Sequence, residues 1–203
     1  MRLINKVVLA IFSWLIAISV GAHDIEEYEE PIELGGFVLG IFHPVQGPDH
    51  LLAMLSVGIL SAQMGGDAIW KVPATFVMVM IIGGVTGLIG IHVSGIELGI
   101  AASVMALGLA LLMETRLPTS WTMLFVAVFG FFHGYAHGSE MPSVAEPLWY
   151  SLGFVVSTAV IHIVGLFVGF LFTRTRIGKN LLRLIGVLIA GTGGYYLAGF
   201  VAS

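Results

Sequence analysis

The chain contains no cysteine and little charge. Its 203 residues include 8 lysines and arginines and 12 aspartates and glutamates, so that only 10% of the chain is charged. The lack of cysteine excludes disulfide bonds, thiolate metal ligands and a cysteine nucleophile, and a site for a soft metal would have to use histidine or methionine. The chain also lacks a glycine-rich phosphate-binding loop and any other nucleotide motif. A nucleotide-driven activity of this chain alone is therefore not expected.

Apolar residues make up most of what is present. The hydrophobic fraction is 58%, the mean hydropathy is +1.02 and there are 27 glycines. This composition is typical of an integral membrane protein. We therefore expect an all-α polytopic domain surrounded by the lipid bilayer, with no nucleic-acid partner, and the sequence is compatible with a homo-oligomer.

The N-terminal segment has the pattern of a secretory signal peptide. Arg2 and Lys6 precede an apolar run, and the small residues Val20, Gly21 and Ala22 follow it. We predict cleavage after Ala22, although an uncleaved first helix is the alternative. Cleavage would leave His23 as the N-terminus, where its amine and ring could chelate a metal ion. Residues 23–34 are then an acidic, solvated periplasmic tail.

The rest of the chain, residues 35–203, is predicted to form a six-helix membrane transport domain. Its apolar stretches lie at residues 35–62, 72–92, 96–113, 119–138, 147–173 and 180–201, each near or above the ~20 residues that span hydrocarbon. With the mature N-terminus in the periplasm, all basic residues after the signal peptide fall on the cytoplasmic side, as the positive-inside rule requires. They are Lys71, Arg116, Arg174, Arg176, Lys179 and Arg183. The predicted location is a bacterial cytoplasmic (inner) membrane, with the mature N-terminus and the C-terminus in the periplasm.

The first apolar stretch contains the motif HPVQGPDH at residues 43–50. Ionisable residues at membrane depth are costly and commonly face an ion, a partner or a cavity. Pro44 and Pro48 each lack an N–H, so the helix should be distorted here, and the distortion offers a way to turn Asp49 towards His43 and His50. We interpret these two histidines and Asp49 as metal ligands; a purely structural polar cluster is the alternative.

The fourth stretch ends in a second motif, FHGYAHGSE at residues 132–140. His133, His137 and Glu140 are spaced at i, i+4 and i+7, which places them on one helix face near its outer end. Imidazole and carboxylate together are suitable ligands for a divalent transition metal. We predict that the two motifs face each other across one cavity open to the periplasm.

The two motifs also resemble each other. Gly40-Ile41-Phe42-His43 corresponds to Gly130-Phe131-Phe132-His133, ninety residues later, and seven positions on lie His50 and Glu140 respectively. Three helices in each half would give a 3+3 inverted repeat, an arrangement that places a transport site between the halves. The repeat is a hypothesis based on a short match.

Both motifs point to a known family. HPVQGPDH fits the pattern HPxxGxDH, FHGYAHGSE fits FHGxAHGxE, and along its whole length the chain resembles the HupE/UreJ family of nickel and cobalt permeases. The resemblance implies uptake of nickel(II) or cobalt(II) by a secondary transporter for metalloenzyme maturation, such as that of hydrogenase or urease. It also implies that His43, Asp49, His50, His137 and Glu140 matter for transport. The metal ion is then the substrate, and no enzymatic cofactor is expected.

Three further polar residues could assist such a site. Gln46 lies between His43 and Asp49 and could orient either one, and His92 ends the second apolar stretch, so both are secondary metal-site candidates with His23. His162 lies in the middle of the fifth stretch, where we expect hydrogen bonding within the core.

An intramembrane zinc-dependent hydrolase is the alternative function. The histidines and Asp49 would hold zinc with one position open for water, and Ser56, Ser94 and Ser157 would be available polar groups. We prefer the transporter, and expect no enzymatic activity, because a site of nitrogen and oxygen ligands suits nickel or cobalt in transit. A metal-sensing accessory protein is less consistent with loops too short to form an output domain.

Overall fold

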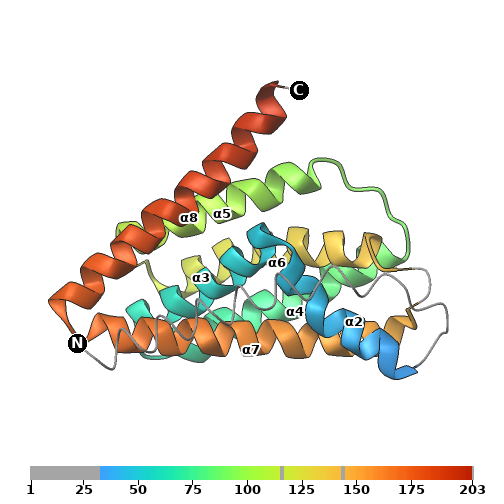
Figure 1. Ribbon diagram of the computed structural model, residues 1–203, viewed down its shortest axis with the longest axis horizontal. Coiled ribbons are helices and arrows are strands. Elements are labelled where there is room, and N and C mark those ends of the chain that lie inside the picture. The colour runs from blue at the N-terminus through green and yellow to red at the C-terminus, as the bar shows by residue number, and fades with distance from the viewer. Residues whose placement is uncertain (1–32, 115–116, 143–144, 203) are drawn as a thin grey trace.

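The computed structural model describes residues 33–114, 117–142 and 145–202, and these residues form helices and no strand. Seven helices are present, labelled as in Figure 1: α2 (Glu33–Gln46), α3 (Pro48–Met64), α4 (Ala68–Leu88), α5 (Ile96–Leu112), α6 (Thr119–Ser139), α7 (Pro147–Thr173) and α8 (Arg176–Ala202). The predicted all-α class is confirmed for this part of the chain. The predicted signal peptide, His23 and Arg116 lie outside the described residues.

The first predicted stretch, residues 35–62, is not a single helix. It is divided into α2 and α3 at Gly47, and Pro48 occupies the first turn of α3. Proline lacks the N–H that would continue the backbone hydrogen-bond ladder, and it is well suited to a helix start. The sequence indicated a kink here, and the structure shows a complete break.

Three of the described helices are long and apolar enough to cross a membrane: α4, α7 and the Arg176–Phe200 part of α8. Helix α5 is apolar but has only 17 residues, and the break at Gly47 leaves α2 and α3 with 14 and 17 residues. Six membrane spans therefore remain a prediction.

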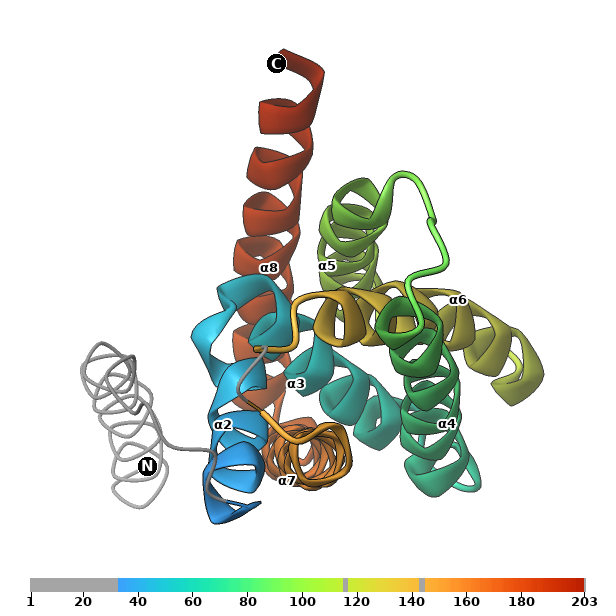
Figure 2. The same cartoon turned by 90° about the vertical axis from the view of Figure 1, so that its right-hand side faces the viewer.

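Glycines allow the helices to pack closely in pairs. Helix α4 packs on α6, α5 on α8, and α2 and α3 together on α7, as Figures 1 and 2 show. A side chain at Gly134 of α6 would collide with the Met80 carbonyl of α4, and one at Gly58 of α3 would collide with the His162 carbonyl of α7. Such small-residue contacts are typical of helix association in membranes, where close backbone approach replaces the hydrophobic effect.

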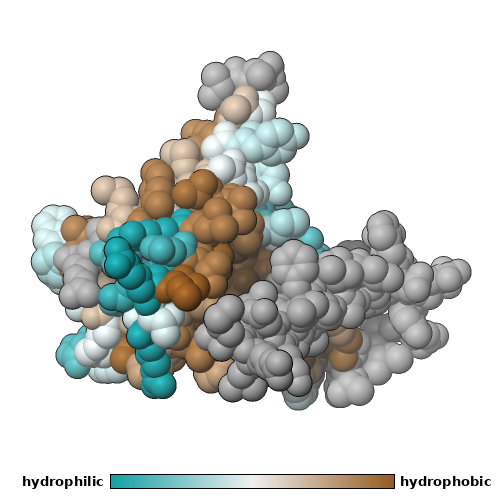
Figure 3. All heavy atoms as spheres, turned by 60° about the vertical axis from the view of Figure 1, so that its left-hand side comes forward, coloured by the Kyte–Doolittle hydropathy of each residue, from teal (hydrophilic) through white to brown (hydrophobic). Residues whose placement is uncertain are grey.

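The described basic residues gather at one end of the bundle, which we call the basic end. They are Lys71, Arg174, Arg176, Lys179 and Arg183, next to the α3–α4 and α7–α8 turns at the left of Figure 1. Figure 3, with this side turned forward, shows a hydrophilic patch beside an apolar surface. At this end the Lys71 amine lies 2.6 Å from an Asp67 carboxylate oxygen, and Arg183 Nε lies 3.0 Å from Glu114 Oε1.

The outward faces of the helices are apolar. Large side chains such as Ile82, Ile163, Phe167 and Leu188 are exposed, whereas Phe76, Val104 and Val126 are fully buried. Exposed apolar side chains in such number are suited to lipid chains rather than to water. These are the helices of a membrane protein.

Candidate functional site: a cluster of four histidines

The break at Gly47 divides the first motif between two helices. His43 lies in the last turn of α2, and Asp49 and His50 lie in the first turn of α3, which begins with the hydrogen bond from Leu51 N to Gly47 O, 3.0 Å. A carboxylate in the first turn is favourable, because the unpaired N–H groups of a helix start carry partial positive charge. The break between the two helices thus places Asp49 in the first turn of α3.

Asp49 and His50 form a tight pair. Asp49 Oδ1 accepts a hydrogen bond from the His50 backbone N–H at 2.8 Å and lies 2.8 Å from His50 Nδ1. This contact orients the ring so that Nδ1 faces Asp49 and Nε2 is directed away from that carboxylate. A Cβ at Gly47 would lie 3.0 Å from both Asp49 Oδ1 and His50 Nδ1, closer than such atoms normally approach. Glycine at this position therefore leaves room for the pair.

The second motif lies on the unbroken helix α6. His133 and His137 are one turn apart and both are buried, with exposed fractions of 0% and 3%. His133 Nδ1 lies 2.9 Å from the Phe129 carbonyl, one turn earlier, so that Nδ1 carries the proton and Nε2 has a free lone pair. Glu140 follows the last residue of the helix, and partial removal from water raises the pKa of its carboxyl.

The structure brings the two motifs together. The His137 ring contacts those of His43 and His50, with centroids 4.7 and 4.3 Å apart, and the His50 ring also contacts that of His133 at 4.8 Å. Glu140 Oε2 lies 3.9 Å from His43 Nε2. The prediction that the motifs face each other is confirmed, and we call His43, His50, His133 and His137 the histidine cluster.

The histidine cluster is rich in buried nitrogens without a hydrogen-bond partner. Among the described residues this holds for Nε2 of His50, Nε2 of His133 and both ring nitrogens of His137. Leaving such atoms unpaired away from water costs about 1–3 kcal/mol each. The edge-on rings fill the space between the nitrogens, and no group of three or more described histidines or carboxylates is gathered in position to hold a metal ion.

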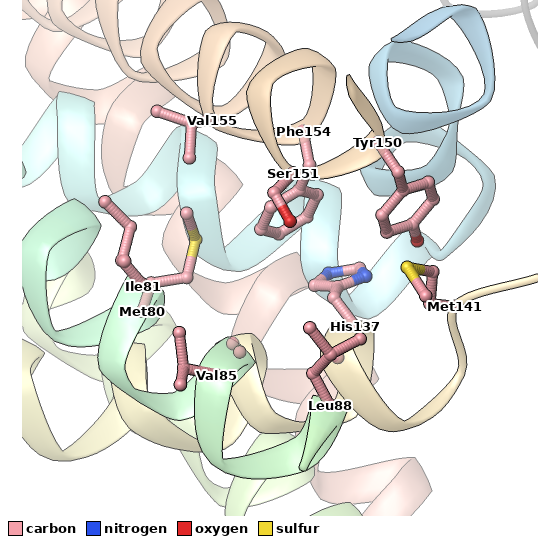
Figure 4. A pocket seen from close by; sticks show the side chains of 13 residues that line it. Met80, Ile81, Val85, Leu88, His137, Met141, Tyr150, Ser151, Phe154 and Val155 are labelled. Carbon is pink, nitrogen blue, oxygen red and sulfur yellow. The ribbon is translucent and has the colours of Figure 1, made fainter. Parts of the chain in front are cut away.

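A cavity of about 110 Å³ lies beside the histidine cluster, between α4, α6 and α7. Figure 4 shows the His137 ring at this cavity, near Tyr150 and Met141. Of the six predicted ligands, all of which the structure describes, His137 alone lines it. The prediction of a cavity between the two motifs is therefore wrong, because the facing rings pack directly against each other.

Three aromatic residues surround the histidine cluster and were not identified from the sequence. Tyr150 contacts His43 at 5.7 Å, Phe154 contacts His137 at 4.1 Å and Phe76 contacts His133 at 5.7 Å between ring centroids. Tyr150 is buried and its hydroxyl has no partner among the described residues. None of the three lies inside either motif, so nothing in the sequence connects them to the histidines.

The other candidates lie apart from these contacts or differ from expectation. Gln46 ends α2 with an exposed side chain, and His92, in the exposed loop after α4, has Nε2 3.4 Å from the Ser94 hydroxyl. Within the described part of the chain, neither ring nitrogen of His162 has a hydrogen-bond partner. The expectation of core hydrogen bonding at His162 is wrong, although the residue is buried.

Comparison with known proteins identifies the same family as the two motifs. The family model described as HupE / UreJ protein matches residues 10–196, which include both motifs. "Protein HupE" of Rhizobium leguminosarum bv. viciae is 37% identical over 165 residues, covering 81% of this chain and 85% of that protein. No solved structure matches the chain. The chain belongs to the HupE/UreJ family.

Proposed function

We propose that the protein is a permease that takes up divalent nickel or cobalt across a bacterial cytoplasmic membrane. The observation that carries the proposal is the contact of four histidines from two distant motifs inside an apolar bundle. Membership of the HupE/UreJ family supports it, since that family is associated with nickel and cobalt uptake for hydrogenase or urease.

The ligand chemistry of the histidine cluster suits these ions. Neutral imidazole nitrogens bind nickel and cobalt well. His50, His133 and His137 all have unpaired ring nitrogens, and the His50 ring contacts both of the others. A divalent ion in an apolar bundle also needs anionic charge nearby. Asp49 and Glu140 supply it, because Asp49 contacts His50 and Glu140 lies near His43.

Ion entry requires the histidine rings to separate. The rings pack edge-on at 4.3 to 4.8 Å, so an ion can be coordinated only after at least one ring turns. The break between α2 and α3 provides a place for movement, since His43 and His50 are attached to different helices. Exposure falls from Glu140 and His43, with 53% and 21% of their side chains exposed, to His133, which is fully buried. We infer that the ion enters from the Glu140 side.

The proposed membrane arrangement places the basic end in the cytoplasm and Glu140 in the periplasm. Helices α2 and α3 together act as the first span, and α4 to α8 complete six. The positive-inside rule then requires a periplasmic C-terminus. A reporter fused after Ser203 should be active only if it functions in the periplasm, and a reporter fused at Gly178 only if it functions in the cytoplasm. A cytoplasmic signal from the Ser203 fusion would refute the six-span arrangement.

The experiment that tests the proposed function is metal uptake by cells. Radiolabelled nickel and cobalt should accumulate faster in cells that produce the protein than in cells that do not, and each metal should compete with the other. Uptake that does not depend on the protein for either metal would refute the proposal.

The contacts of Ser56 and Ser139 do not favour a hydrolase, and Ser94 contacts a histidine only in the exposed loop after α4, where its hydroxyl lies 3.4 Å from His92 Nε2. The Ser139 hydroxyl, inside the second motif, donates to the Ala136 carbonyl, and that of Ser56 donates to the Leu52 carbonyl. Both hydroxyls are thus engaged by their own helices rather than by a histidine.

A further inference from the structure

His162 is a buried histidine whose role the histidine cluster does not explain. It lies in the middle of α7, is 3% exposed, and has no hydrogen-bond partner for either ring nitrogen among the described residues. A carbonyl one turn earlier is available to a helical histidine, and His133 uses that of Phe129 in this way. The His162 ring does not do so, and therefore has two free nitrogens in an apolar interior.

Thr158 lies one turn before His162 and shows the same feature. Its side chain is 0% exposed and its hydroxyl has no partner in the described part of the chain. A helical serine or threonine normally donates to the carbonyl four residues earlier, and Ser61, Thr75 and Thr192 do so here. Thr158 departs from this pattern, so that a hydroxyl and two imidazole nitrogens share one helix face without protein partners.

Phe76 connects this pair to the histidine cluster. Its ring, fully buried in α4, contacts His133 at 5.7 Å and His162 at 5.2 Å between ring centroids. His162 therefore lies one aromatic ring away from the innermost member of the histidine cluster. The backbone of α7 is held firmly here, because its His162 carbonyl packs against Gly58 of α3.

We propose that His162 and Thr158 form a second, inner binding station for the same class of divalent transition-metal ion. The inference rests on the proposed function, because the station would receive the ion from the histidine cluster after movement of the Phe76 ring. The ligands are neutral imidazole nitrogen and a hydroxyl oxygen, and both are donors that nickel and cobalt accept. Unpaired polar atoms at this depth are costly, and such groups in membrane proteins commonly mark an ion path.

The inner station should bind more weakly than the histidine cluster. Asp49 and Glu140 lie beside the cluster, whereas no carboxylate has a described contact with His162 or Thr158. Weak binding is suited to transit, since conduction requires each site to release the ion as well as to accept it.

Equilibrium dialysis of the purified full-length protein against nickel ions tests the inner station directly. We expect two ions per chain, one tight and one weak. His162→Leu keeps the approximate volume but removes both nitrogens, and it should lose the weak ion and retain the tight one. Thr158→Val should lower the nickel affinity of the second site by about tenfold, whereas Thr158→Ser should keep it close to that of the wild type. The matched control is Ser157→Ala at the neighbouring buried position, which should change the binding of neither ion.

Uptake measurements give the second readout. His162→Leu should slow nickel uptake by about tenfold at equal protein level, while the tight ion is still bound. A single bound ion in the wild type, or two retained ions in His162→Leu, overturns the inner station. Slow uptake with both ions retained overturns it as well, because His162 would then act on something other than the metal, such as a proton.

Two further results separate the possible failures. If His162→Leu does not fold, the comparison of Thr158→Val with Thr158→Ser decides the question, and equal second-site binding by these two variants overturns the inner station. If the wild type takes up neither metal, the proposed function fails, and the number of bound ions still determines whether the inner station exists.

Discussion

Each motif contributes two histidines to the histidine cluster, but the two motifs differ in backbone conformation. In α6 the helix is continuous, and the i, i+4 spacing of His133 and His137 aligns both rings on one buried face. In the first motif the helix is interrupted at Gly47, and His43 and His50 belong to different helices. The His137 ring contacts both of them.

This difference indicates a division of roles between the motifs. The continuous motif is held by close packing, since backbone atoms of α4 lie directly against Gly134 and Gly138. The broken motif has a helix start with a carboxylate in its first turn, and its side chains are partly exposed, with 24% of Asp49 and 21% of His43 accessible. We infer that α6 is the fixed wall of the site and that the α2–α3 break is its adjustable side.

The largest effect is expected from Asp49→Asn. This change keeps the shape of the side chain but removes the only carboxylate of the broken motif, so an ion entering the histidine cluster would lack its nearest anion. Nickel uptake should fall by roughly 100-fold at unaltered protein level. The matched control is Asp67→Asn at the basic end, where the carboxylate pairs with Lys71 on an exposed surface. Equal uptake by the two variants would contradict the proposed role of Asp49.

Within the continuous motif, His137→Gln should have a larger effect than His133→Gln. His137 has two unpaired ring nitrogens and contacts both histidines of the broken motif, whereas one nitrogen of His133 is already bound to the Phe129 carbonyl. Nickel affinity, measured by equilibrium dialysis, should fall by about 10- to 100-fold for His137→Gln and by less for His133→Gln. The reverse order would mean that the ion binds deeper than the ring contacts indicate.

Gly134→Ala tests whether α6 is a fixed wall. The added methyl group would collide with the Met80 carbonyl, and α4 and α6 would have to move apart. Overpacking of this kind costs about 1–3 kcal/mol, which should appear as a lower melting temperature of the purified protein. Gly191→Ala in α8 is the control, because a Cβ there meets no atom within 4 Å. Similar melting temperatures for both variants would show that the α4–α6 contact is not tight.

The smallest effect is expected from Gly47→Ala at the break. A Cβ would lie 3.0 Å from Asp49 Oδ1 and from His50 Nδ1, and a shift of a few tenths of an ångström would relieve the contact. Nickel affinity should therefore weaken severalfold, while the melting temperature stays close to that of the wild type. A large loss of stability with unchanged affinity would reverse the roles assigned to the two motifs.

The helices themselves could be predicted well where apolar runs are long and uninterrupted. The stretch predicted at residues 147–173 coincides with α7, Pro147–Thr173, because Pro147 is a favourable first residue and a long apolar run follows it. At residues 35–62 the two prolines indicated distortion but not its extent. Whether a helix bends or breaks depends on what surrounds it, and here α2 and α3 both pack against α7.

By itself, the sequence determined the all-α class, the residue types of the candidate site and the meeting of the two motifs, because these follow from composition and from residue spacing along a helix. Only the tertiary structure decided which rings touch, that the space between the motifs is filled, and that His162 lies unpaired behind Phe76. The physical reason is that helical periodicity sets the direction of a side chain relative to its own axis, whereas partners depend on how closely glycines let the helices approach.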